Sequence, residues 1–164
     1  MNPIVPNEII LKKIFMIRDE KVMLDRDLAE LYGVKTKVLK QAVRRNISRF
    51  PQDFMFELTK KEFGNLRSQI VTSSHGGLRY LPMVFTEQGI AMLSSVLNSD
   101  KAIQMNIQII RIFTKIRRLV LENNDLKKEL EDHKELSEER FRIIFETLDQ
   151  LMAIEENPRK KIGF

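Results

Sequence analysis

The chain has 164 residues, 43% of them hydrophobic, and no cysteine, which excludes a wholly disordered protein, disulfides and a cysteine nucleophile. The longest run without a charged residue, Gln88 to Ser99, has 12 residues, whereas a transmembrane helix needs about 20, so we expect no membrane span. The N-terminus, MNPIVPNEII, has no basic region ahead of a long apolar stretch, so we expect no secretory signal. Residues 1–119 carry a net charge of +9 and residues 120–164 a net charge of −4. This asymmetry suits a body that binds a polyanion and an acidic arm, although ordinary solvated surfaces show it as well.

The first third of the chain changes from strand patterns to helix patterns. We expect residues 1–11 to be loose, because prolines interrupt them, and residues 13–24 to form a β-hairpin that turns at Asp19 to Lys21. Two helices should follow from Asp25, separated near Gly33 and Val34, and Pro51 should break the second helix.

The middle of the chain has clear helix-start signals. Residues 54–58 are a candidate strand, and the pattern Thr59 to Glu62 is a capping box that predicts a helix ending near Gln69. A second candidate strand covers residues 80–85. Thr86 should cap a helix that runs to about residue 97, and Ser99 should cap the last and longest helix.

The segment from Asp27 to Arg49 carries the pattern with the clearest functional meaning. Gly33 permits a tight turn, Ala29 lets the two helices approach closely, and Leu39 fills the angle between them. A single buried stripe on the second helix is predicted at Val38, Leu39, Ala42 and Val43. This spacing is typical of a DNA-binding helix-turn-helix, although a packed helix pair with a basic outer face can show it by chance.

The second helix of such a motif lies in the major groove, with its N-terminal residues on base edges. Residues 35–49 contain six basic residues and no acidic one. Gln41 can bind adenine bidentately and Arg44 can bind guanine, whereas Arg45 and Arg49 suit phosphate contacts. The candidate DNA-binding residues are Lys35, Thr36, Lys37, Lys40, Gln41, Arg44, Arg45, Arg49 and, in a later loop, Arg79.

Three blocks in this part of the sequence, LDRDLAELYGV, RNISRFPQDFMFEL and FTEQGIAMLSSVL, resemble the ORF-six-N-terminal domain. That family consists of phage and prophage DNA-binding domains related to the KilA-N and Bro-N modules, and the resemblance covers about residues 10–100. It implies sequence-directed DNA binding in phage or bacterial regulation, often of antirepressor type, in the cytoplasm of a bacterial or phage-infected cell. His75 departs from the family pattern, which has a large aromatic residue there.

The loop from Ser73 to Arg79 permits two interpretations. Its two glycines, with Ser73, His75 and Arg79 around them, suit a wing that touches the DNA backbone or minor groove. An ordinary connection between two strands would look the same.

Catalytic motifs are absent: the sequence has no Walker A run, no G-x-G-x-x-G, no H-E-x-x-H and no G-x-S-x-G. Asp25, Asp27 and Glu30 are the one acidic cluster that resembles a magnesium site, but carboxylates at a helix start also cap free amides. The two histidines, His75 and His133, lie far apart in the sequence. We therefore expect no enzyme, no metal and no cofactor.

Heptads from residue 102 predict a long helix to residue 136, with a coiled coil in its distal half. Asn123 at an a position, and Glu-Lys pairs between g and e positions, favour a parallel homodimer, whereas a single solvated helix remains the alternative. A second apolar face near Ile103 and Phe113 should dock on the domain body. The expected dimerisation residues are Ile116, Leu119, Asn123, Leu126 and Leu130.

The sequence thus predicts an α+β fold with short strands and a helix-turn-helix, followed by a long C-terminal helix. The segments are a loose N-terminus (1–11), a KilA-N-like DNA-binding domain (12–100), the long helix (101–136), a second amphipathic helix (137–157) and a basic tail (158–164). The predicted function is transcriptional regulation by binding double-stranded DNA as a homodimer. The alternative is an antirepressor-type module that captures a repressor through Phe141, Ile144 and Leu148.

Overall fold

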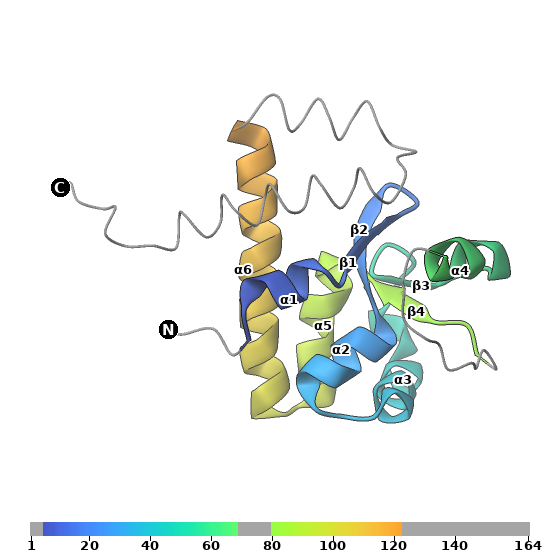
Figure 1. Cartoon of the computed structure of the whole chain (residues 1–164). Coiled ribbons are helices and arrows are strands. Elements are labelled where there is room, and N and C mark those ends of the chain that lie inside the picture. Colours follow the sequence, from blue (N-terminus) through green and yellow to red (C-terminus); the bar gives the residue numbers. More distant parts are fainter. Residues whose placement is uncertain (1–4, 69–79, 123–164) are drawn as a thin grey trace. The chain divides into compact units, whose positions relative to one another are not determined.

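The computed structural model describes residues 5–68 and 80–122 (Figure 1). This part of the chain contains six α-helices and one four-stranded antiparallel sheet, which confirms the predicted α+β class. The elements in chain order are α1 (Asn7–Leu11), β1 (Ile14–Ile17), β2 (Glu20–Leu24), α2 (Asp25–Tyr32), α3 (Thr36–Arg45), a 3₁₀ turn (Ile47–Arg49), β3 (Met55–Glu57), α4 (Lys60–Arg67), β4 (Met83–Phe85), α5 (Glu87–Leu97) and α6 (Asp100–Glu122). None of the described helices is both long enough and apolar enough to cross a membrane.

The chain divides into two compact units, Lys13–Ile110 and a second one made of residues 1–12 and 111–164. The first unit holds the sheet and most of the helices. In the second unit, the structure describes α1 and the distal part of α6, where Ile10, Leu11, Ile112 and Phe113 are buried. The N-terminal segment expected to be loose therefore contains a short helix with two buried residues.

The predicted hairpin is present, and its turn lies one residue earlier than expected. Ile17 pairs with Glu20, so the turn consists of Arg18 and Asp19, which have φ angles of 54° and 63°. Positive φ at both central positions is the mark of a type I′ turn, whose twist matches that of antiparallel strands. Glu20 and Lys21 belong to β2.

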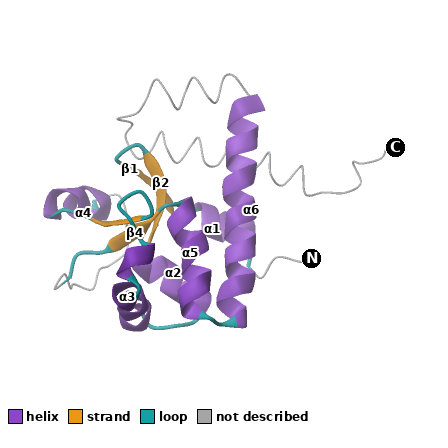
Figure 2. Cartoon of the chain, turned by 180° about the vertical axis from the view of Figure 1, so that it is seen from behind, coloured by secondary structure: helices purple, strands orange, loops and turns teal. Residues whose placement is uncertain are grey.

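The sheet has the strand order β1-β2-β4-β3, so β4 pairs with strands from two earlier parts of the chain. Figure 2 shows the strands in orange. Successive side chains of a strand point to opposite faces of the sheet. Val84 and Phe85 are neighbours in β4 and both are fully buried, so both faces of the sheet are covered there. One cross-strand row consists of Leu24, Val84 and Phe56, and it packs with Phe63 and Leu66 of α4. On the opposite face, Phe85 meets the ring of Phe50 edge-on, with ring centroids 6.0 Å apart.

Helix starts follow the predicted capping chemistry. The Thr59 hydroxyl accepts the N–H of Glu62 and the Glu62 carboxylate accepts the N–H of Thr59, so the predicted capping box is formed at α4. Thr86 accepts the N–H of Gly89 at α5, and Ser99 accepts the N–H of Ala102 at α6. The last helix of the prediction is confirmed as far as Glu122.

Candidate nucleic-acid interface

The turn between α2 and α3 is built as the glycine position predicts. Gly33 has a φ of 77°, a left-handed conformation that costs a residue with a side chain about 1–2 kcal/mol. The N–H of Gly33 bonds to Glu30 O (3.2 Å) and the N–H of Val34 to Ala29 O (3.0 Å). These two bonds form a Schellman motif, which ends α2 and redirects the chain into α3.

The inner face of α3 differs from the prediction at two positions. Leu39 and Val43 are fully buried, as expected. Val38, predicted to lie in the buried stripe, is 46% exposed, and Lys40, predicted to face outward, is only 8% exposed. The buried stripe is therefore rotated about the helix axis, so that the aliphatic stem of Lys40 packs inward and Val38 faces solvent.

A buried ion pair explains the inward position of Lys40. Its ammonium lies 3.6 Å from Asp25 Oδ2 and 3.4 Å from the carbonyl oxygen of Leu81. Asp25 is 3% exposed and also accepts the N–H of Met83 (2.9 Å) and the N–H of Arg26 (2.6 Å). Burial raises the pKa of the Asp25 carboxyl, and the Met83 N–H and Lys40 oppose that rise.

This network fixes the orientation of α3 within the unit Lys13–Ile110. The Asp25 side chain starts at the first residue of α2 and connects the middle of α3 to the first residue of β4. The inner face of α3 is thereby attached to the domain by the buried side chains of Leu39 and Val43 and by the ion pair of Lys40. The sequence signal for this network is Asp25, one of two acidic residues in the first turn of α2, but its partner depends on the tertiary fold.

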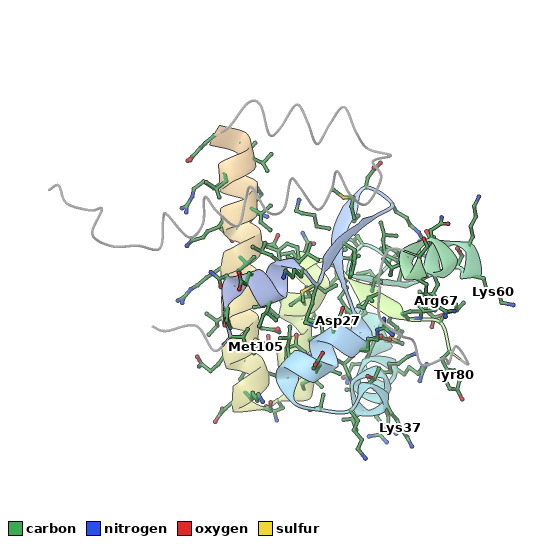
Figure 3. All side chains as sticks on the ribbon, in the orientation of Figure 1. Asp27, Lys37, Lys60, Arg67, Tyr80 and Met105 are labelled. Carbon is green, nitrogen blue, oxygen red and sulfur yellow. The ribbon has the colours of Figure 1, made fainter. Side chains whose placement is uncertain are left out.

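The outer face of α3 carries hydrogen-bonding side chains that have no partner among the described residues. Figure 3 shows Lys37 pointing away from the domain. These side chains are exposed, and none forms an ion pair or hydrogen bond with another residue of ranges 5–68 and 80–122: Lys35, Lys37, Gln41, Arg44 and Arg45. Thr36 is half-buried, and Arg49 donates to Ser95 Oγ at 3.0 Å. The α3 helix also ends earlier than expected, at Arg45, with Arg49 in the following 3₁₀ turn.

The acidic cluster at α2 forms ion pairs within the domain. Lys13 lies 3.6 Å from Asp27 and 3.4 Å from Glu30, and Asp25 is paired with Lys40. Burial raises the pKa of Asp27, which Lys13 opposes. Across the described ranges, no group of acidic, histidine or cysteine side chains could hold a metal ion.

Two surface features were not predicted from the sequence: an exposed tyrosine and a second basic helix. Tyr80 is 71% exposed, and the Lys40 ammonium lies 5.6 Å from the centre of its ring. The exposed Lys60, Lys61 and Arg67 make α4 a second basic helix. Figure 3 shows Lys60, Arg67 and Tyr80 at the right of the view and Lys37 at the bottom. The basic character of α4 is visible in the sequence as the run KKEFGNLR, but the capping box predicts only that this run is a helix and says nothing of its charge.

A short link ties α4 to the hairpin. The Arg18 guanidinium donates to both carboxylate oxygens of Glu62, at 2.7 and 2.9 Å, and lies 4.2 Å from the centre of the Phe56 ring. The hydrogen bonds from Arg18 lower the pKa of Glu62 to about 2. Glu62 thus serves both the helix cap and the link between α4 and the turn of the hairpin.

Several predicted site residues lie outside the described ranges: the loop residues His75 and Arg79, and the coiled-coil residues Asn123, Leu126 and Leu130. Of the other two expected dimerisation residues, Leu119 is half-buried and Ile116 is 1% exposed within the single chain. The Ile116 side chain is therefore not available to a second chain in this conformation. In α6, Met105 and Ile109 are also buried, whereas Ile103, expected on the docking face, is 37% exposed.

The fold and this surface define an α+β domain with a small antiparallel sheet, in which a basic helix packs against α2 and α5 and exposes its outer face. Residues 12–96, just over half of the chain, match the ORF6N domain. The chain therefore belongs to the ORF6N family, a phage-associated domain family, as its sequence blocks predicted. No curated protein and no solved structure gives a significant match to the chain.

Proposed function

We propose that the chain binds double-stranded DNA through the outer face of α3 and acts as a phage- or prophage-type transcriptional regulator. The observation that carries the proposal is a set of five exposed hydrogen-bonding side chains on α3 and at its N-cap, four of them basic, which have no partner among the residues that the structure describes. No acidic residue lies between positions 35 and 49, and a helix with this charge suits a polyanion.

The way in which α3 is held supports the same function. A helix that reads base edges has to keep a fixed orientation, because hydrogen bonds to bases depend on the direction of each donor. The buried pair of Asp25 and Lys40 supplies such a constraint without placing a negative charge on the outer face. Membership of the ORF6N family points to the same class of function, and DNA binding would place the protein in the cytoplasm.

Two copies of the chain would read paired half-sites if the distal helix dimerises. This part of the proposal rests on the heptads of residues 123–136, because Ile116 is buried within the chain. The alternative, capture of a repressor by residues 137–157, likewise concerns residues outside the described ranges. Sedimentation equilibrium of the full chain with and without Asn123→Leu tests the dimer, since a polar a position fixes the register and number of strands.

The first experiment is fluorescence anisotropy with random-sequence duplex DNA over a salt series. The test variant removes Lys37, Arg44 and Arg45 by substitution with alanine. If each of the three contacts one phosphate, the slope of log affinity against log salt should become less negative by about 2–3 units.

The control variant removes three exposed basic residues that belong to other elements than α3, Lys12, Arg111 and Arg118, and so changes the net charge by the same amount. It should keep the slope within about one unit, since no specific phosphate contact is lost. If the two variants behave alike, or if binding is weak and independent of salt, α3 is not the DNA-binding element. The test would then turn to capture of a partner protein by the C-terminal residues.

A further inference from the structure

The exposed valine on α3, Val38, is not part of the core. Val38 is the third residue of α3 and 46% exposed, although it was expected in the core. An isolated exposed apolar side chain is ordinary on a protein surface. The position of Val38 near the start of α3 matters, because the N-terminal residues of a recognition helix reach base edges.

The neighbours of Val38 define the middle of the outer face. Gln41 and Arg45 follow it at spacings of three and seven residues, so the three side chains lie in one row along the helix. Leu39, Lys40 and Val43 occupy the opposite, buried side. The row therefore presents an apolar group, an amide and a guanidinium, in that order from the N-terminal end of α3.

These three groups match distinct features of base pairs in the major groove. The amide of Gln binds adenine bidentately, a guanidinium binds guanine or a phosphate, and an apolar side chain contacts the C5-methyl group of thymine. Val38 and Gln41 are separated by about 4.5 Å along the helix axis, which is close to the spacing of about 3.4 Å between base pairs. They can therefore contact neighbouring base pairs.

We infer that Val38 contacts the methyl group of a thymine and that Gln41 binds an adenine beside it, so that each half-site contains A·T pairs at adjacent positions. This inference rests on the proposed function and specifies the chemistry that the same helix reads. A protein-binding role for Val38 is less consistent with its surroundings, because the row and its flanks are basic and offer no further large apolar side chain on α3.

The experiment begins with selection of a tight-binding duplex from a randomised pool by the full-length protein. In the selected duplex, each thymine is replaced in turn by deoxyuridine, which removes only the C5-methyl group. At one position in the half-site, the wild type should lose about fourfold in affinity, the amount expected for one buried methyl group. Val38→Ala should bind the original duplex about as weakly and should be insensitive to deoxyuridine at that position.

Ile47→Ala is the matched control, because Ile47 is also an exposed aliphatic residue, at 54%, but lies beyond the end of α3. It should retain the full effect of deoxyuridine. Both variants should unfold at the temperature of the wild type, since neither side chain is in the core.

The outcomes separate this inference from the proposed function. If every deoxyuridine substitution affects wild type and Val38→Ala equally, or if the selected site lacks thymine, the methyl contact is wrong while DNA binding stands. If selection enriches no duplex and binding does not depend on salt, both the inference and the proposed function are wrong.

Discussion

Replacement of Lys40 by methionine tests whether the buried ion pair holds α3. Methionine keeps most of the aliphatic stem, so the packing around position 40 should change little. The substitution removes the ammonium 3.6 Å from Asp25, whose carboxylate is 3% exposed. Breaking a buried pair costs about 3–5 kcal/mol, and we expect about 3 kcal/mol here, because Asp25 keeps its bonds to the N–H groups of Met83 and Arg26.

The cost should depend on pH in a definite direction. Lys40 opposes the rise in the pKa of Asp25, so its removal should raise that pKa further above the ordinary value of 3.8. A carboxyl whose pKa is raised in the folded state destabilises the fold, and this penalty is full above the folded pKa and falls as the pH drops toward the unfolded pKa. The destabilisation of Lys40→Met should therefore be smaller at pH 5 than at pH 7.

Urea unfolding followed by circular dichroism at both pH values measures the change in the free energy of unfolding. Lys37→Met is the control, since Lys37 is exposed on the same helix and its replacement should cost less than about 0.5 kcal/mol. A cost below about 1 kcal/mol for Lys40→Met at pH 7, the range of a surface ion pair, would refute the reasoning. So would a cost that is the same at both pH values. Under conditions in which both variants are folded, only Lys37→Met should change the dependence of DNA binding on salt.

Three further predictions concern the packing of the domain. Gly89→Ala should destabilise the domain by about 3 kcal/mol in the urea unfolding assay, because a Cβ there would overlap the carbonyl oxygen of Phe54. Gly64→Ala is its control, because a Cβ there has no atom within 4 Å, and it should stabilise α4 by about 0.5–1 kcal/mol in the same assay. Glu62→Gln should cost about 1 kcal/mol at pH 7. Since the pKa of Glu62 is lowered to about 2, the wild type should lose this advantage as the pH falls from about 4.5 to 2, and a cost that persists at pH 2 would contradict the charged link between Glu62 and Arg18. Tyr32→Phe should cost about 1–2 kcal/mol, because it leaves the buried oxygen of Asn106 without its donor; an unchanged urea midpoint would show that this hydrogen bond is not important.

Local chemistry accounts for the parts of the fold that could be predicted from the sequence. The capping box at Thr59, the turn at Gly33 and the caps at Thr86 and Ser99 each depend on residues within a few positions of one another. The order of the strands could not be predicted, because β4 pairs with β2 and β3, and nothing in a local pattern specifies these partners.

The position of the basic helix α3 was predicted correctly, whereas the predicted burial of two of its residues was wrong. The helix, its basic character and most of its exposed residues are as expected. The exchange of Val38 and Lys40 could not be predicted, because hydrophobicity alone assigned the valine to the core. The alternative depends on Asp25, which lies 15 positions earlier in the sequence, and the basic residue beside Asp25 in the chain is Arg26 rather than its partner Lys40.

The division of α3 into a held side and an exposed side has a consequence for how such a domain can acquire new targets. Leu39, Lys40 and Val43 attach the helix, whereas Val38, Gln41 and Arg45 contribute nothing to the core. Exchange of the second set should leave folding almost untouched, since exposed substitutions away from special features change stability by less than about 0.5 kcal/mol. If α3 binds an operator as proposed, preference for a new operator can therefore evolve, or be engineered, by substitutions at three positions without compensating changes elsewhere in the domain.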